Sequence, residues 1–121
     1  MGRILIVDDD KDIRDIFKRA FENAGHEVIT ANNGRVCEEL YEQKKPDVIV
    51  LDIIMPEQEG IETILNLKRI NPNVKIIAVS GGGMGGAFNY LNNALKFGAK
   101  AVFEKPVNHE ELIYQIDLLL R

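Results

Sequence analysis

The stretch ILIVDDD at Ile4–Asp10 runs from apolar residues directly into three aspartates, and VIVLD at Val48–Asp52 repeats the pattern. Short, continuous runs of Val, Ile and Leu are typical of strands covered on both faces, as in a parallel sheet. Together with similar signals elsewhere in the chain, these two runs predict five strands, at Arg3–Val7, His26–Thr30, Val48–Leu51, Val74–Val79 and Ala101–Phe103.

Stretches with helical periodicity separate the strands. The last of them is the clearest, with apolar residues at Leu112, Ile113, Ile116, Leu119 and Leu120. Glycine follows the first and fourth helices, as expected for helix C-termini. Regular alternation of strand and helix predicts an α/β fold built from five strand–helix units. We expect residues 1–121 to form one domain, with no effector domain in this chain.

Composition narrows the class of protein. The chain has 121 residues, 45% of them hydrophobic, and a net charge of −4, which disfavours direct binding to nucleic acid. Its apolar stretches are far shorter than the roughly 18 residues of a membrane span. One cysteine, Cys37, excludes an internal disulfide and fits a reducing compartment. We therefore expect a cytoplasmic protein with no membrane association.

Polar residues follow the predicted strands. Asp8 and Asp9 follow the first strand, Asp52 the third, Ser80 the fourth and Lys105 the fifth. Because parallel strands end at a common edge of the sheet, these groups are expected to meet there. Clustered carboxylates repel one another unless a cation neutralises them, and hard oxygen ligands suit Mg²⁺. Asp10 stands nearest the first helix and is expected to cap it instead.

Four motifs, in order along the chain, resemble the receiver domain of two-component response regulators. They are the acidic Ile4–Asp10 segment, Asp47–Pro56 with its Met-Pro turn and Gly60 beyond, Ala78–Ser80, and Gly98–Pro106. The resemblance implies a flavodoxin-like, doubly wound, five-stranded parallel sheet of order 2-1-3-4-5 with five helices. A chemotaxis protein of the same family is a known example of this strand order, so the order is adopted from the resemblance.

The resemblance also implies a role for each residue at that edge. Asp52 would accept a phosphoryl group, and Asp8, Asp9, Asp52 and the backbone carbonyl of Ile54 would hold Mg²⁺. Lys105 would pair first with the carboxylates and then with the phosphoryl oxygens. The peptide bond between Lys105 and Pro106 would be cis, which would turn Lys105 toward the site. Ser80 would donate a hydrogen bond to the phosphoryl group, and Phe103 would be the coupled switch aromatic.

The resemblance also implies two kinds of signalling partner, one that donates the phosphoryl group and one that receives the signal. The phosphoryl donor would be a sensor histidine kinase or a phosphotransfer protein. The fourth helix, the strand at Ala101–Phe103 and the last helix would form the face that binds a downstream protein or a second copy of the chain. We expect Tyr90, Phe97, Tyr114 and Leu118 to point outward, and Leu91, Ala94 and Leu95 to point to the core. His26 and His109 are expected at the surface or a strand edge.

Three alternatives remain open. Gly81, Gly83 and Gly86 match the dinucleotide-binding pattern G-x-G-x-x-G, but that pattern belongs on the first strand–helix turn, which is acidic here. A phosphatase acting through an aspartyl-phosphate is disfavoured by Ile54, where a second Asp would stand. An unphosphorylated scaffold leaves the acidic, hydroxyl and lysine set unexplained. We expect a domain that catalyses only its own phosphorylation and dephosphorylation.

The glycine run itself prompts one hypothesis. Gly81 stands where the family usually has Ala, and five of the six residues 81–86 are glycine. Glycine lacks the Cβ that restricts the backbone, so we expect a mobile loop that leaves the phosphorylated site open to water.

Overall fold

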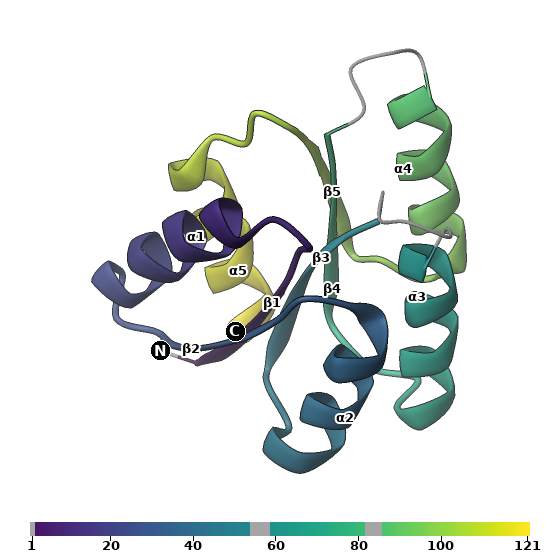
Figure 1. Cartoon of the computed structure of the whole chain (residues 1–121), viewed down its shortest axis with the longest axis horizontal. Helices are drawn as coiled ribbons and strands as arrows, with labels where there is room; N and C mark the ends of the chain where they lie inside the picture. The colour runs from purple at the N-terminus through teal and green to yellow at the C-terminus, as the bar shows by residue number, and fades with distance from the viewer. Residues whose placement is uncertain (1, 54–58, 82–85) are drawn as a thin grey trace.

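A five-stranded parallel sheet forms the centre of the molecule (Figure 1). The computed structural model describes residues 2–53, 59–81 and 86–121. The strands lie in the order β2-β1-β3-β4-β5, which confirms the predicted topology. Their bounds are β1 Arg3–Val7, β2 Glu27–Ala31, β3 Val48–Asp52, β4 Ile76–Ser80 and β5 Ala101–Glu104.

Five helices cover the sheet in two layers. Figure 1 shows α1 and α5 on one face and α2, α3 and α4 on the other. Their bounds are α1 Lys11–Asn23, α2 Gly34–Lys44, α3 Glu59–Ile70, α4 Gly86–Phe97 and α5 His109–Leu120. Within the described ranges, no helix is both long and apolar enough to cross a membrane.

Each face of the sheet has its own apolar core. Odd and even positions of a strand point to opposite faces, so Ile49 and Leu51 join the α2–α3–α4 layer, whereas Val48 and Val50 join the α1–α5 layer. Every residue of β3 and β4 is buried. This double coverage explains why these runs are almost purely apolar.

Side-chain caps begin three of the helices. Asp10 precedes α1 and accepts a hydrogen bond from the N–H of Asp12, as predicted for a cap. Asn33 and Asn108 do the same for α2 and α5. Gly25 and Gly98 follow α1 and α4 with φ of 95° and 123°, a conformation that favours glycine.

Two expectations about side-chain exposure are wrong. His26 is buried, because its Nδ1 accepts a hydrogen bond from the N–H of Gly2 and its Nε2 lies 3.1 Å from Asp117. Leu95 is 45% exposed, because Ala94 occupies the position on α4 that faces the sheet. His109, expected at the surface, is half-buried with its ring against Phe17.

The other exposure predictions for α4 and α5 are confirmed wherever the side chain is described. Phe97, Tyr114 and Leu118 are exposed, and Ala94 is buried, as expected. The side chains of Tyr90 and Leu91 lie outside the described residues. With Leu95, four large apolar side chains on α4 and α5 are therefore exposed among the described residues.

Candidate functional site

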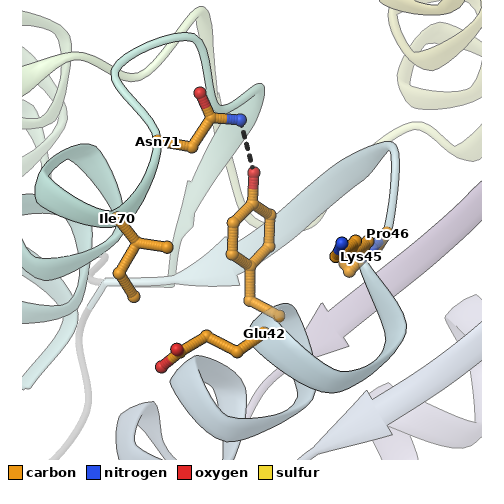
Figure 2. A pocket seen from close by; sticks show the side chains of 6 residues that line it. Glu42, Lys45, Pro46, Ile70 and Asn71 are labelled. Carbon is orange, nitrogen blue, oxygen red and sulfur yellow. Dashed lines mark hydrogen bonds between the residues drawn. The ribbon is translucent and has the colours of Figure 1, made fainter.

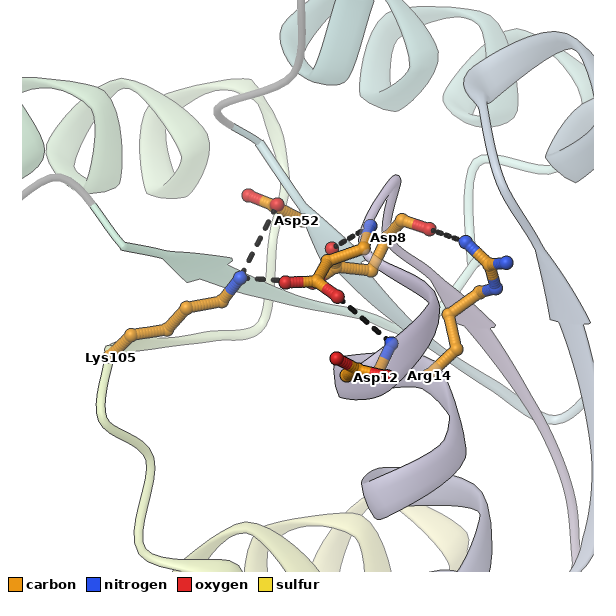
Figure 3. A network of polar contacts seen from close by, with 6 residues as sticks. Asp8, Asp12, Arg14, Asp52 and Lys105 are labelled. Atoms are coloured by element: carbon orange, nitrogen blue, oxygen red, sulfur yellow. Dashed lines mark hydrogen bonds and ion pairs between the residues drawn. The ribbon is translucent and has the colours of Figure 1, made fainter.

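Two buried aspartates lie at the carboxyl edge of the sheet, one directly after β1 and one at the end of β3. Asp8 and Asp52 are 2% and 5% exposed. Lys105, which follows β5, places its Nζ 2.9 Å from Asp8 Oδ2 and 3.4 Å from Asp52 Oδ2 (Figure 3). Residues far apart in the sequence thus form one buried ion-pair network.

A third carboxylate completes an acidic cluster. Asp9 is exposed, and it offers an oxygen that, with one from Asp8 and one from Asp52, forms a set all within 4.8 Å of one another. At that separation and an effective dielectric of about 20, two carboxylates repel by about 3 kcal/mol. Carboxylate oxygens with one side open to solvent are the donor set that Mg²⁺ prefers. These three residues therefore fit a divalent cation.

Lys105 keeps its positive charge in this setting. Burial is the largest single influence on its pKa and lowers it, but hydrogen bonding to Asp8 and the attraction of both carboxylates outweigh burial. The pKa of Lys105 is consequently raised above 10.5. The ammonium group offsets part of the carboxylate charge across the neutral pH range.

A buried hydroxyl lies on the neighbouring strand. Ser80 is fully buried at the end of β4, one residue beyond Val79, whose Cα pairs with that of Asp52. Its carbonyl accepts a hydrogen bond of 2.7 Å from the N–H of Lys105. Its Oγ has no hydrogen-bond partner within the described part of the chain. Leaving a buried hydroxyl unpaired costs about 1–3 kcal/mol, so Ser80 is well suited to donate to a bound oxygen.

Phe103 does not share a face with Ser80. Phe103 packs in the α1–α5 layer, whereas Val102 packs in the α2–α3–α4 layer. Strand alternation places Ser80 on the same face as Ala78, which belongs to the α2–α3–α4 layer. Val102 is therefore the β5 residue on the Ser80 face, and the switch role expected of Phe103 stays a prediction.

Two surface hollows differ in their relation to the acidic cluster. One of about 430 Å³ lies near the ends of α2 and α3, where Asn71 donates a hydrogen bond of 2.9 Å to the Tyr41 hydroxyl (Figure 2). It is at the opposite edge of the sheet from the cluster, beside the residues that precede β3. Another, of about 420 Å³, adjoins the site and is lined by Ile13, Ile16, Phe17, Gly81, Lys105, Pro106, Val107 and His109.

Comparison with known proteins agrees with this geometry. The family model for the response regulator receiver domain matches residues 4–117. The chain belongs to this family. Receiver domains are phosphoacceptor switches that interact with histidine kinases and downstream effectors, and are not enzymes acting on a separate substrate.

Relatives of this receiver domain include both short and long proteins. The chemotaxis protein CheY of Thermotoga maritima is 39% identical over 92% of this chain and 91% of its own length. The DNA-binding transcriptional regulator NtrC of Azospirillum brasilense is 32% identical over 97% of this chain, which spans only 24% of NtrC. The crystal structure of a CheY-like receiver domain protein from Methanospirillum hungatei JF-1 matches with a TM-score of 0.89 and 32% identity, covering 99% of this chain and 94% of that one.

Most residues predicted from the sequence meet in the receiver domain as expected. Asp8, Asp9, Asp52 and Lys105 converge, and the Lys105–Pro106 peptide bond is cis. Ile54, predicted to offer its carbonyl to the cation, lies outside the described residues, as do residues 82–85 of the glycine-rich loop.

Sequence reasoning missed Arg14. Its guanidinium donates a hydrogen bond of 2.7 Å to the backbone carbonyl of Asp8 (Figure 3). The available signal is its place in the first turns of α1, six residues after Asp8, where a long donor side chain can reach back to the acidic loop.

Proposed function

We propose that Asp52 accepts a phosphoryl group from a phosphohistidine of a sensor kinase or phosphotransfer protein, in a reaction that requires Mg²⁺. The observation that carries this proposal is the buried contact of Lys105 with Asp8 and Asp52 beside the exposed carboxylate of Asp9. A network of this kind presents a nucleophilic carboxylate, a cation-binding group and a fixed positive charge at one point.

The chemistry needs little besides positioning and charge. The Asp52 carboxylate attacks phosphorus as an ionised nucleophile, an O–P bond forms, and the N–P bond of the donor breaks, leaving its electron pair on the imidazole. No general base is required, since the nucleophile carries no proton. Asp8, Asp9 and Asp52 would hold Mg²⁺, which when bound supplies positive charge against the phosphoryl oxygens. Lys105 then pairs with a phosphoryl oxygen in place of the Asp52 carboxylate.

Ser80 acts as the sensor of the modified state. Its buried Oγ donates a hydrogen bond to a phosphoryl oxygen on Asp52, which relieves the cost of leaving that hydroxyl unpaired. Because the carbonyl of Ser80 is bonded to the N–H of Lys105, movement of Ser80 acts on the end of β5. Val102 and Phe103 pass that movement to the layers on either side of the sheet.

The output surface consists of α4, β5 and α5. Phe97, Tyr114 and Leu118 leave exposed apolar area on these helices. We propose that phosphorylation changes the affinity of this face for a downstream protein or a second copy of the chain. The hollow that adjoins Lys105 and is lined by Phe17 and His109 gives a phosphodonor protein an apolar surface next to the site. A cytoplasmic location, where such donors act, is in keeping with the free thiol of Cys37.

Intact-mass spectrometry after incubation with acetyl phosphate and Mg²⁺ tests the proposal. The wild-type chain should gain the mass of one phosphoryl group, and chelation of Mg²⁺ should prevent the gain. Asp52→Asn should show no gain, while Asp15→Asn, which removes an exposed carboxylate on α1, should behave as wild type. An unmodified wild type would leave the scaffold interpretation, and continuous release of phosphate without the adduct would favour a phosphatase.

A further inference from the structure

We infer that Arg14 is a positioning residue that orients Asp9 for the cation; this rests on the proposed function. Asp8 and Asp52 are buried and follow or end strands, so the sheet itself fixes their carboxylates. Asp9 is exposed and lies in the loop between β1 and α1. The direction of its side chain therefore depends on how the loop backbone is held.

Every polar group of Asp8 is engaged, and Arg14 supplies one of the contacts. The N–H of Asp8 donates to the carbonyl of Ala31, Oδ1 accepts from the N–H of Asp10, and Oδ2 accepts from Lys105. The remaining group, the carbonyl of Asp8, accepts the hydrogen bond of 2.7 Å from Arg14. That carbonyl belongs to the peptide that joins Asp8 to Asp9, so the guanidinium fixes the orientation of that peptide.

Arg14 comes from a rigid element. It is half-buried in the first turns of α1, and its own N–H donates to the carbonyl of Asp10. Asp10 in turn caps the helix. Figure 3 shows the guanidinium reaching from the helix to the far side of the loop from Lys105. The acidic loop is thus held from both sides, by Lys105 on a side chain and by Arg14 on the backbone.

Because Arg14 is positively charged, the direction in which Mg²⁺ affinity changes on its removal tests the inference. A guanidinium near a cation site repels the cation, so if Arg14 acted only as a charge, its removal would tighten Mg²⁺ binding. If it positions Asp9, its removal weakens binding, and loss of a residue that orients metal ligands typically costs about 10–100-fold in affinity.

Calorimetric titration with Mg²⁺ alone distinguishes these outcomes. We expect Arg14→Met to weaken Mg²⁺ binding by about tenfold or more. Arg19→Met, which removes an exposed arginine from the same helix, should leave the affinity unchanged. Affinity that is equal to or tighter than wild type in Arg14→Met overturns the inference.

A second measurement does not depend on the metal. Amide hydrogen exchange in the metal-free protein reports on the Asp10 N–H, which is bonded to Asp8 Oδ1. Arg14→Met should raise its exchange rate by about tenfold, and Arg19→Met should not change it. Unchanged exchange in Arg14→Met refutes the positioning role, whether or not the wild type binds Mg²⁺. Failure of the wild type to bind Mg²⁺ would count against the proposed function. Unfolding curves recorded in chelator confirm that each variant is folded.

Discussion

Replacing Lys105 with Met should destabilise the metal-free protein and strengthen its binding of Mg²⁺. Met keeps most of the side-chain length and removes the charge. The Nζ lies 2.9 Å from Asp8 and 3.4 Å from Asp52, so at an effective dielectric of about 20 each contact is worth about 5 kcal/mol of Coulomb energy. Dehydration of the three groups offsets much of this sum. Removing one partner from a buried ion pair costs about 3–5 kcal/mol, and the side chains here are 22%, 3% and 6% exposed.

Urea unfolding at neutral pH, in chelator and in Mg²⁺, measures both effects. In chelator, Lys105→Met should lower the free energy of unfolding by about 3 kcal/mol, because Asp8 and Asp52 are left buried without the Lys105 ammonium group. Mg²⁺ at about 100 times its dissociation constant should restore about 2.7 kcal/mol. Lys11→Met, which breaks an exposed ion pair with Asp15, is the control and should leave the midpoint unchanged.

A double-mutant cycle isolates the interaction. Adding Asp52→Asn to Lys105→Met should recover part of the lost stability, with a coupling energy of about 1 kcal/mol or more, because one of the two repelling carboxylates becomes neutral. Additive effects, or weaker Mg²⁺ binding by Lys105→Met, would refute the reasoning that Lys105 offsets the charge of the acidic cluster.

Three further predictions concern other parts of the chain. Burial raises the pKa of the Cys37 thiol from 9.0 to about 12, so the unfolded state loses this proton first as the pH rises. The free energy of unfolding should therefore fall between pH 9.0 and about 12, by up to about 1.4 kcal/mol per pH unit. Unfolding curves of Cys37→Ala should lack this fall, and an unchanged dependence of stability on pH in that variant would contradict the prediction. A Cβ on Gly60 would lie 2.6 Å from the carbonyl oxygen of Ile53, so Gly60→Ala should cost about 3 kcal/mol in urea unfolding, and a wild-type midpoint would argue against this close approach. A Cβ on Gly81 would lie 2.9 Å from Cδ of Lys105, whose ammonium is held at its far end; Gly81→Ala should therefore crowd the site and slow the loss of phosphate from the phosphorylated protein severalfold, whereas equal rates would remove this role for the glycine.

Local sequence patterns are sufficient for most of the architecture. Continuous apolar runs such as Val48–Leu51 identify strands because both faces of a parallel sheet are covered. Asp10 is recognisable as a helix cap because the chemistry of capping involves neighbours only two or three residues away. Convergence of Asp8, Asp52 and Lys105 follows from the rule that parallel strands end at one edge.

The failures share a different cause. His26 is buried because Gly2 and Asp117, which are 24 and 91 residues away, satisfy its two ring nitrogens. Leu95 and Ala94 are adjacent on one helix, and only the packing of α4 on the sheet decides which of them is covered. Strand alternation shows that Val102 and Phe103 point to opposite faces of the sheet, but only the packed structure shows that Val102 shares the face of Ser80.

Periodicity and near neighbours along the chain are enough to specify the succession of strands and helices, the caps and the set of residues that reaches the carboxyl edge of the sheet. Only the packed structure reveals the contacts of 2.9 and 3.4 Å made by Lys105, the unpaired hydroxyl of Ser80 within the described residues, and the hold of Arg14 on the acidic loop. Those features depend on distances between segments of the chain that are far apart in the sequence. Their interaction energies change with distance and burial, and packing rather than any single residue sets both.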